Sequence, residues 1–424
     1  MLDSQRTVHL GLASLAMLLS LQLTCCADIN SEPDQTPPGI VPSTAPRQPT
    51  QPPQSTATGP RIGGASVVAG DAQIALLLPL TGRQSAAATD VRDGFLTAYY
   101  SLPAADRPEV RVYDTAQMSI AAALNQATQD GAGFIVGPLT RDDVSVAAAY
   151  TGPRPPMLTL NAIVGSIPAG NALYQFALSP EDEARQAARR VIMDGNRAGV
   201  ALVPSGEWGN RVLAAFTQEL NAGGGVLLDA ATYDASGTDY AAPISQVLRI
   251  NESESRGKRL ESVLGTRLTF QARRRGDVSF VFSPGQPQPE RLLRQQLKFY
   301  FAGDVPTYAT ADAFEPNSNA NQDLDGLVFP GAPWLLGGAL VDGVRDVTNA
   351  AWPVGGPRRS ILFAFGFDAA RLALALRSLP VRSTSATSLA VDGLTGHLTI
   401  ATDGRVLRDL MWAQFRNGEP RVLN

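Results

Sequence analysis

Apolar and polar positions alternate along the first half of the chain in segments that predict strands followed by helices. Residues 74–80 (IALLLPL) form a continuous apolar run, which is typical of a strand covered on both faces of its sheet. Val91, Phe95 and Tyr99 then recur at every fourth position and predict a helix with one apolar face. The same patterns predict strands at 109–115, 133–138, 156–161 and 173–179 and helices at 121–131 and 141–150.

A helix with a well-marked start opens a second series of the same kind. Ser179 is suited to the N-cap, Pro180 to the first helical position, and the acidic residues 181–183 to the positive end of the helix dipole. Gly195 marks its end. After it, we expect strands at 198–206, 225–233, 277–285 and 305–314, a helix with Val212, Phe216 and Leu220 on one face, and a helix at 289–303.

The end of the chain has a different pattern. Val406, Arg408, Leu410 and Trp412 alternate with other positions and are predicted to share one face of a strand. The dipeptides Asp-Gly and Asn-Gly in this region are turn signals. We therefore predict an antiparallel ribbon that crosses or edges the rest of the fold.

Repeated β-α-β units indicate parallel sheets joined by right-handed crossovers. The 354 residues that follow the first 70 of the 424-residue chain exceed the size at which a single core usually divides. We therefore expect an α/β fold of two doubly wound parallel-sheet lobes with a C-terminal antiparallel ribbon. Residues 71–180 and 328–395 are assigned to lobe 1, and residues 181–327 and 396–424 to lobe 2.

The first 25 residues have the pattern of a lipoprotein signal peptide. The apolar run at 10–23 is too short to span a hydrocarbon core of roughly 30 Å, and it fits the hydrophobic region of a secretory signal. Leu23-Thr24-Cys25-Cys26 resembles a bacterial lipobox, in which Cys26 is lipidated after Cys25 is removed. Bacterial lipoproteins with Asp directly after the lipidated cysteine tend to stay in the inner membrane. Here Ala27 follows Cys26, which favours the outer membrane. An ordinary cleaved signal peptide or an uncleaved anchor are the alternatives.

Composition changes this picture in two ways. Residues 26–70 are expected to be a lipidated N-terminus and a disordered linker, because nine prolines among Gln, Thr and Ser bury too little apolar surface to offset the entropy of ordering. A net charge of −4 leaves no overall basic excess for a nucleic-acid backbone. We therefore expect no nucleic-acid partner.

Candidate catalytic chemistry is sparse. Beyond the signal segment His397 is the only histidine, so a triad with a histidine base has few ways to form. No phosphate-binding glycine motif and no metal-ligand spacing occur in the sequence. A pair of carboxylates for glycoside hydrolysis is not marked by any motif. We expect a protein that is not an enzyme and needs no cofactor or metal.

Several stretches carry a resemblance to known families. IALLLPLTG, EWGN after the sixth predicted strand and the final D-G-R-V hairpin resemble the type I periplasmic-binding fold, which has two lobes and a cleft between them. Residues 250–282 and 301–336 resemble the LppC-type lipoproteins, the penicillin-binding protein activator family. This resemblance implies a lipoprotein in the outer membrane, facing the periplasm, that stimulates a bifunctional peptidoglycan synthase of the inner membrane.

The fold resemblance also implies an alternative function, a lipid-anchored receptor for an amino acid or similar small polar ligand. In amino-acid-binding relatives, loops after the third and fourth strands hold the ligand carboxylate and an aromatic residue closes from the other lobe. The other interpretation is that these loops only pack the lobes together. The candidate cleft residues are Thr81, Gly82, Thr140, Asn161, Ser205, Trp208 and Asp312, with Asp312 a candidate partner of a ligand amine.

A basic stretch at 256–275 stands out in an acidic chain, with seven Lys or Arg residues and one acidic residue. It is either a solvated excursion or a docking surface for an acidic patch on a partner, where complementary charge would speed association. Reversing Arg273, Arg274 and Arg275 to Glu is expected to weaken partner capture and to leave the melting temperature nearly unchanged. The candidate partner-binding residues are Arg256, Lys258, Arg259, Arg273, Arg274 and Arg275.

Overall fold

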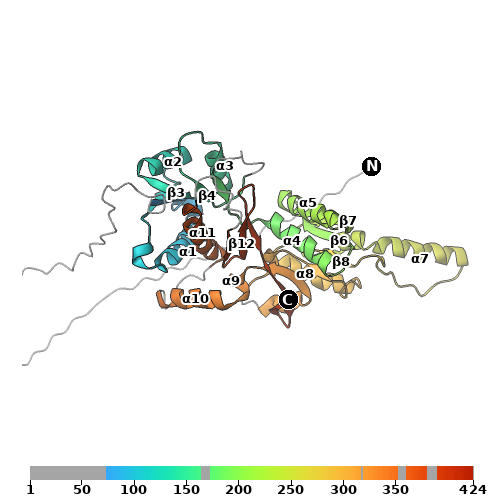
Figure 1. The fold of residues 1–424 in the computed structure, drawn as a ribbon. Coiled ribbons are helices and arrows are strands. Elements are labelled where there is room, and N and C mark those ends of the chain that lie inside the picture. Colours follow the sequence, from blue (N-terminus) through green and yellow to red (C-terminus); the bar gives the residue numbers. More distant parts are fainter. Residues whose placement is uncertain (1–72, 164–171, 317–318, 352–359, 380–388, 424) are drawn as a thin grey trace, which may run out of the picture. The chain divides into compact units, whose positions relative to one another are not determined.

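The computed structural model describes residues 73–163, 172–316, 319–351, 360–379 and 389–423 (Figure 1). The predicted signal peptide and linker, including Cys26, lie outside these residues. The described chain forms two lobes, each built on a sheet, and a small third sheet. This arrangement confirms the predicted α/β fold with an antiparallel C-terminal part.

Lobe 1 is built on a five-stranded parallel sheet in the order β2-β1-β3-β4-β5. Strand β1, which lies between β2 and β3, is buried along its whole length, as the continuous apolar run predicts. Ile74, Leu76 and Leu78 face one core cluster, whereas Ala75 and Leu77 face the other. The strands are β1 (Gln73–Leu78), β2 (Val110–Asp114), β3 (Ala132–Val136), β4 (Met157–Thr159) and β5 (Leu173–Gln175).

Helices α1 and α11 cover one face of this sheet, and α2 and α3 cover the other. Two glycines let α1 and α11 approach closely. A Cβ atom on Gly94 would lie 1.9 Å from the carbonyl oxygen of Phe363, and one on Gly366 would lie 1.9 Å from that of Val91. The helices are α1 (Ser85–Tyr100), α2 (Ile120–Gln129), α3 (Arg141–Ala149), α9 (Pro333–Leu336), α10 (Ala339–Ala351) and α11 (Ile361–Arg377).

Lobe 2 is built on a seven-stranded sheet in the order β15-β14-β10-β9-β8-β6-β7. Strands β10, β9, β8, β6 and β7 are parallel to one another. Strands β14 and β15 add an antiparallel edge beside β10. The strands are β6 (Ala198–Pro204), β7 (Val226–Tyr233), β8 (Phe280–Phe282), β9 (Thr307–Tyr308), β10 (Leu327–Gly331), β14 (Met411–Arg416) and β15 (Glu419–Leu423).

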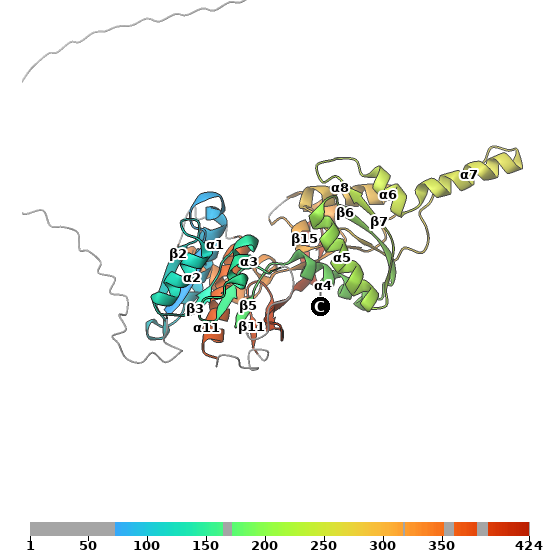
Figure 2. The same ribbon diagram turned by 90° about the horizontal axis from the view of Figure 1, so that it is seen from above.

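Helices α4 and α5 pack on one face of the second sheet, and α6 and α8 pack on the other (Figure 2). Helix α4 begins as predicted, because the Ser179 side chain accepts a hydrogen bond from the Asp182 backbone N–H. The helices are α4 (Pro180–Met193), α5 (Glu207–Ala222), α6 (Ala241–Val247), α7 (Ile250–Leu264) and α8 (Pro287–Phe299), and short 3₁₀ turns are η1 (Gly82–Gln84), η2 (Ala104–Asp106), η3 (Ala311–Ala313) and η4 (Asn319–Leu324).

The third sheet is antiparallel and consists of β11 (Ala390–Asp392), β12 (His397–Ile400) and β13 (Val406–Asp409). The predicted single strand through residues 406–412 is divided, because β13 ends before Leu410 and β14 then joins the sheet of lobe 2. The apolar residues Leu398, Ile400 and Val406 pack into the core of lobe 1.

The lobe boundaries differ from the assignment made from sequence. Strand β10, which includes the start of the segment assigned to lobe 1 at 328–395, pairs with β9 and β14 in the sheet of lobe 2. Strands β12 and β13, from the segment assigned to lobe 2 at 396–424, contribute to the core of lobe 1. The apolar pattern identifies a strand, but it does not specify which sheet the strand joins.

Candidate functional site

The chain passes between the two lobes at three places, and these crossings lie together. The first follows β5 and leads into α4, the second follows β10 and leads into α9, and the third joins β13 to β14. Leu178, Ala332 and Leu410, one from each crossing, line the same cavity. The cavity has a volume of about 1560 Å³. The loops after β7, β8, β9 and β10 also reach it, so the carboxyl ends of these four strands lie toward this cavity.

A buried ion pair lies at the cavity wall. Arg408 of β13 donates to the Glu183 carboxylate of α4 at 3.3 Å, with side-chain exposures of 5% and 11% respectively. The second oxygen of Glu183 accepts the backbone N–H of Ala311 at 3.0 Å. Burial raises the pKa of Glu183 above its ordinary value, and the charge of Arg408 opposes that rise. The carboxylate is thus fully engaged by groups from two other segments.

Gln186 adds two hydrogen bonds to the same junction. Its amide nitrogen donates to the carbonyl oxygen of Arg408 at 2.8 Å, and its amide oxygen accepts the backbone N–H of Leu410 at 3.0 Å. One face of α4 therefore binds both the main chain and the side chain of the third crossing. These two hydrogen bonds join α4 of lobe 2 to the segment between β13 and β14.

Aromatic and charged side chains also line this cavity, among them Trp334, Arg345 and Asp312. Trp334 is only 4% exposed and packs on Phe363 with ring centroids 5.4 Å apart. Arg345 stacks over the Trp334 ring at 5.2 Å and donates to its carbonyl oxygen at 2.6 Å. Partial burial of its carboxyl group raises the pKa of Asp312 above its ordinary value, although the residue as a whole is exposed. Of the seven candidate cleft residues, Asp312 lines this cavity.

A second, smaller cavity of about 620 Å³ is also lined by residues of the first crossing, Ala177, Leu178 and Ser179. Asn161 lines it, together with four arginines and three acidic residues. The Asn161 amide nitrogen donates to the carbonyl oxygen of Leu139, and its amide oxygen accepts the N–H of Ala162, so this side chain holds its own loop. Three of the four arginines are paired within the cavity: Arg185 with Asp182, Arg211 with Glu181 and Arg405 with Asp403.

The remaining candidate cleft residues have local contacts. The Thr81 hydroxyl donates to Asp114, which ties the turn after β1 to the end of β2. Gly82 has a φ of 75° and opens η1. Thr140 caps α3, where its hydroxyl accepts the N–H of Asp143. Ser205 is exposed, and Trp208, in the first turn of α5, packs against the core. The structure therefore does not bring the seven residues together, and a ligand site formed by them stays a prediction.

The basic stretch divides into structural and free residues. Arg275 forms two contacts with Asp277, at 2.6 and 2.8 Å, and this pairing lowers the pKa of Asp277 to about 2. Arg274 pairs with Asp304 at 3.0 Å. Arg273 is exposed. The expectation that all three arginines can be reversed without a loss of stability conflicts with the first two pairings.

Sequence reasoning missed the residues at the junction. Glu183 stood in an acidic run that was assigned to the helix dipole, and Arg408 was assigned to a strand face. One signal did mark Arg408, because it occupies an inward position between Val406 and Leu410 in the alternating pattern. A charged residue at such a position requires a partner, but the partner lies 225 positions away in sequence.

Catalytic and metal chemistry find little support in the described part of the chain. His397 is half exposed, and its Nδ1 lies 2.6 Å from the carboxylate of Asp392. This partner is an acidic group and not the hydroxyl or thiol nucleophile that a histidine base would activate. Among the described residues, no cluster of His, Cys, Asp and Glu has the arrangement of a metal site. None of the helices in the described ranges is long and apolar enough to cross a membrane.

Comparison with known families then identifies the chain. The sequence profile described as "LppC putative lipoprotein" matches residues 68–418. The chain belongs to the LppC family. The LppC chain is 29% identical over 346 residues to the Penicillin-binding protein activator LpoA of Photobacterium profundum. This match covers 81% of this chain and 55% of that protein. The chain thus spans about half the length of the curated relatives it matches.

Solved structures agree on the fold. The LpoA C-domain of Haemophilus influenzae, described as a regulator of PBP1A, has a TM-score of 0.62 at 23% identity and covers 83% of this chain and 100% of that one. The leucine-binding protein LivK of Thermotoga maritima has a TM-score of 0.51 at 16% identity, covering 83% of this chain and 97% of that one. The predicted resemblance to the activator family and to the periplasmic-binding fold is confirmed.

Proposed function

We propose that this LppC chain is a non-catalytic lipoprotein that binds and regulates a bifunctional peptidoglycan synthase. The observation that carries the proposal is the family match over residues 68–418, combined with relatives that are named as activators of penicillin-binding proteins. The relative of known structure that is matched over its full length is described as a regulator of PBP1A. A synthase of the penicillin-binding protein class is therefore the partner.

The geometry of the junction supports a role in contact rather than in solute capture. Glu183, Gln186 and Arg408 tie the lobes together through side chains and main chain. In the smaller cavity, most guanidinium groups are already paired with carboxylates of the same wall. Groups that are satisfied by one another have less to offer a polar ligand. These contacts favour a protein whose surface binds another protein over one whose cavity binds a solute.

The proposed anchor fits this task. Lipidation of Cys26 places the N-terminus in the outer membrane, and several acyl chains hold it there because each buried CH₂ contributes roughly 0.8 kcal/mol. At about 3.1 Å per residue, the Pro-rich residues 28–61 could extend for roughly 100 Å from the membrane. Metabolic labelling with a fatty-acid analogue tests this anchor, and Cys26→Ala is expected to remove the label and the outer-membrane location.

A reconstituted synthase assay tests the function itself. The purified chain is titrated against a class A penicillin-binding protein of its own organism, and the rates of glycan polymerisation and peptide crosslinking are followed on lipid-linked precursor. We expect saturable binding and a rise in at least one rate. The chain alone should leave the precursor unchanged. Absence of binding to every class A synthase of the organism would exclude the proposal.

The second candidate function is a receptor for a small polar solute. It is supported by the cavity of about 1560 Å³ and by Asp312, which is one of its lining residues. A ligand that binds only the folded state stabilises it by RT ln(1 + [L]/Kd), which gives about 2.7 kcal/mol at one hundred times Kd. A thermal-shift screen with amino acids and muropeptides checks this function. A rise of several degrees with one solute, lost in Asp312→Asn, would favour the receptor.

A further inference from the structure

A helical arm extends from lobe 2, and it contains the whole basic stretch 256–275. The arm consists of α7 and the return segment, residues 250–275, and it points away from the body of the lobe (Figures 1 and 2). At its base, the N–H of Arg275 donates to the carbonyl oxygen of Leu248 at 3.0 Å. The return segment runs back along α7, so the arm is a folded hairpin.

Three contacts hold the return segment on one side of α7. The Arg273 N–H donates to the Ser253 hydroxyl at 3.1 Å, and the Leu268 N–H donates to the Glu261 carboxylate at 2.9 Å. Phe270 covers Gly257, where a Cβ atom would lie 2.5 Å from its ring. Ser253, Gly257 and Glu261 follow one another at four-residue spacing and therefore form one face of the helix. That face is the one that the arm covers itself.

A different face of α7 remains open to solvent. Arg256, Arg259, Leu260 and Val263 are spaced i, i+3, i+4 and i+7 and therefore share one face, which we call the stripe. Val263 is 77% exposed and Leu260 is 49% exposed. Arg256 makes only a 3.8 Å contact with Glu252, and no ion pair is found for Arg259 among the described residues. The stripe thus combines exposed apolar side chains with cationic groups that are weakly engaged.

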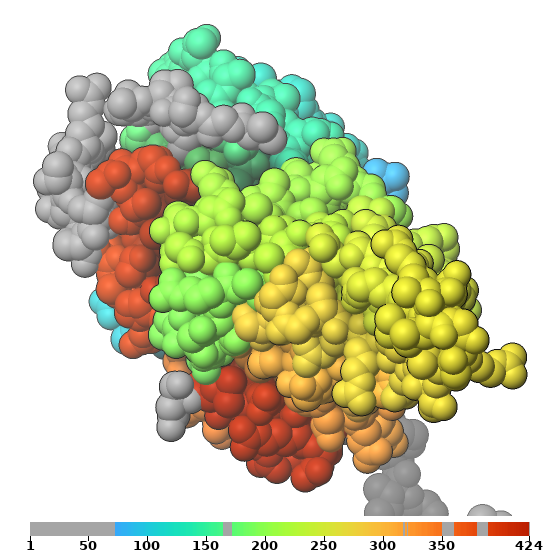
Figure 3. All heavy atoms as spheres, turned by 90° about the vertical axis from the view of Figure 1, so that its right-hand side faces the viewer, coloured from blue at the N-terminus to red at the C-terminus, as the bar shows by residue number. Residues whose placement is uncertain are grey.

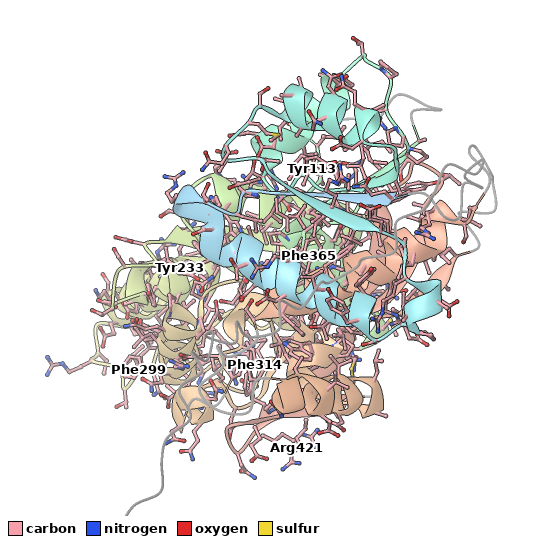
Figure 4. All side chains as sticks on the ribbon, turned by 90° about the vertical axis from the view of Figure 1, so that its left-hand side faces the viewer. Tyr113, Tyr233, Phe299, Phe314, Phe365 and Arg421 are labelled. Carbon is pink, nitrogen blue, oxygen red and sulfur yellow. The ribbon has the colours of Figure 1, made fainter. Side chains whose placement is uncertain are left out.

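Exposed aromatic residues lie at the base of the arm. The Arg274 guanidinium donates to the carbonyl oxygen of Phe301 at 2.7 Å, which places the end of α8 beside the return segment. Phe299 and Phe301 are 75% and 48% exposed. Phe299 lies at the edge of the molecule in Figure 4, whereas Phe365 lies in the interior. In Figure 3 the yellow atoms of the arm and the gold atoms that follow them in the chain are neighbours on one face.

The backbone at Phe301 supports a functional reason for this exposure. Phe301 has a φ of 57°, in the left-handed region that bulky residues rarely adopt. Glycine or asparagine would relieve the strain, and a polar residue would suit the solvent better. Strained positions of this kind cluster at functional sites. Arginine and aromatic residues are also the types that most often anchor protein interfaces.

We propose that the stripe and the two phenylalanines form the surface that docks the partner, and that the partner presents an apolar patch bordered by carboxylates. This inference rests on the proposed function, in which that partner is the synthase. The chain as a whole has a net charge of −4, so the arginines of the stripe are a local basic feature that an acidic partner surface would complement.

A membrane surface is the less favoured occupant. Helices that lie on anionic membranes separate a basic face from an apolar face. On α7, basic and apolar residues share the stripe, and three acidic residues offset the three basic residues of the helix: Glu252, Glu254 and Glu261 against Arg256, Lys258 and Arg259. Helix α7 itself therefore has no net charge, and the basic excess of the arm lies in the return segment, on the face of α7 that the arm covers. The mixture of charge and apolar area matches a protein interface better.

Two neighbouring charge reversals test the surface. Arg259→Glu changes the stripe, and Lys258→Glu makes the same change one residue away on another side of α7, so it serves as the matched control. The affinity of the full mature chain for the purified class A synthase is measured by biolayer interferometry at two salt concentrations. We expect Arg259→Glu and Val263→Ser each to weaken binding at least tenfold, and Lys258→Glu to change it less than threefold. Unchanged melting temperatures show that the variants are folded.

Each outcome decides between the inference and the function on which it rests. If the wild-type chain binds no synthase, the proposed function fails and the docking surface fails with it. If the wild-type chain binds and both arginine and lysine variants bind equally well, or lose affinity equally, the docking surface is wrong while the function stands. Binding of the wild-type chain to phosphatidylglycerol vesicles, lost in Arg259→Glu, together with unchanged synthase affinity, would assign the stripe to a membrane instead.

Discussion

Glu183 and Arg408 form a buried ion pair at 3.3 Å that joins α4 of lobe 2 to β13, whose Val406 belongs to the core of lobe 1. Removing one member of such a pair leaves an uncompensated buried charge, and this typically costs about 3–5 kcal/mol. We therefore predict that Arg408→Met lowers the free energy of unfolding by an amount in that range, measured by urea denaturation. The double variant Glu183→Gln with Arg408→Met should recover part of the loss, because no charge then remains buried.

Arg405 provides the matched control for this prediction. It lies three residues earlier in the same region and pairs with Asp403 at 2.7 Å, but both side chains are about half exposed. An exposed pair contributes less than about 1 kcal/mol. Arg405→Met should therefore change stability very little. A similar loss in Arg405→Met and Arg408→Met would mean that the buried pair has no special role in holding the lobes.

The junction also illustrates what the sequence does not specify. The strands and helices of each lobe follow from local patterns, such as the apolar run of β1 and the cap at Ser179, and the structure confirms both. The assignment of β10 to a lobe and the partner of Arg408 depend on contacts between segments far apart in the chain. Periodicity reports the environment of a residue along its own element. It carries no information about which distant segment supplies that environment.

The candidate sites show the same division. The fold resemblance placed Asn161 and Asp312 in loops that do line cavities, but in two different ones. The basic stretch was visible in sequence as charge alone. Which of its arginines are free depends on the position of Asp277 and Asp304, and this is determined by the tertiary fold.

The contact of α1 with α11 depends on two glycines, and Gly94→Ala should therefore be strongly destabilising. The added Cβ would lie 1.9 Å from the Phe363 carbonyl oxygen, so the helices must separate. Overpacking of a close contact costs about 1–3 kcal/mol or more. Gly343 of α10 is an exposed helix glycine, and a Cβ atom added there would meet no atom within 4 Å, so Gly343→Ala should be neutral or stabilise by up to about 1 kcal/mol. Thermal unfolding that affected both variants alike would contradict this account.

Charge reversals at Arg275 and Arg273 should distinguish the loss of a structural ion pair from a simple change in surface charge. Arg275→Glu places a carboxylate against Asp277, in a position where the wild-type side chain is only 11% exposed. We expect the melting temperature to fall by at least about 2 °C. Arg273→Glu, in the same segment and with the same change of charge, should shift it by less than about 1 °C because Arg273 is exposed. Equal shifts in a calorimetric scan would show that the pairing of Arg275 is unimportant.

Glu290 of α8 should make stability depend on pH. The side chain is fully buried, and burial raises its pKa to about 8, although hydrogen bonds from Ser283 and Tyr233 and the charge of Arg294 oppose the rise. In the unfolded chain a glutamate has a pKa of about 4.3. The folded state therefore holds this proton more tightly. Its contribution to stability is complete below about pH 4 and is lost as the pH rises through about 8.

The Glu290→Gln variant tests this dependence, because the amide resembles the protonated carboxyl group and cannot ionise. Wild-type stability should fall between about pH 5 and pH 8, with this group contributing a slope of up to about 1.4 kcal/mol per pH unit. The variant should show a flatter profile and gain most relative to the wild type near pH 8. Glu207→Gln, whose wild-type side chain is 87% exposed, should keep the wild-type slope. Urea unfolding at several pH values measures all three chains, and a slope in Glu290→Gln equal to that of the wild type would mean that Glu290 is already ionised in the fold.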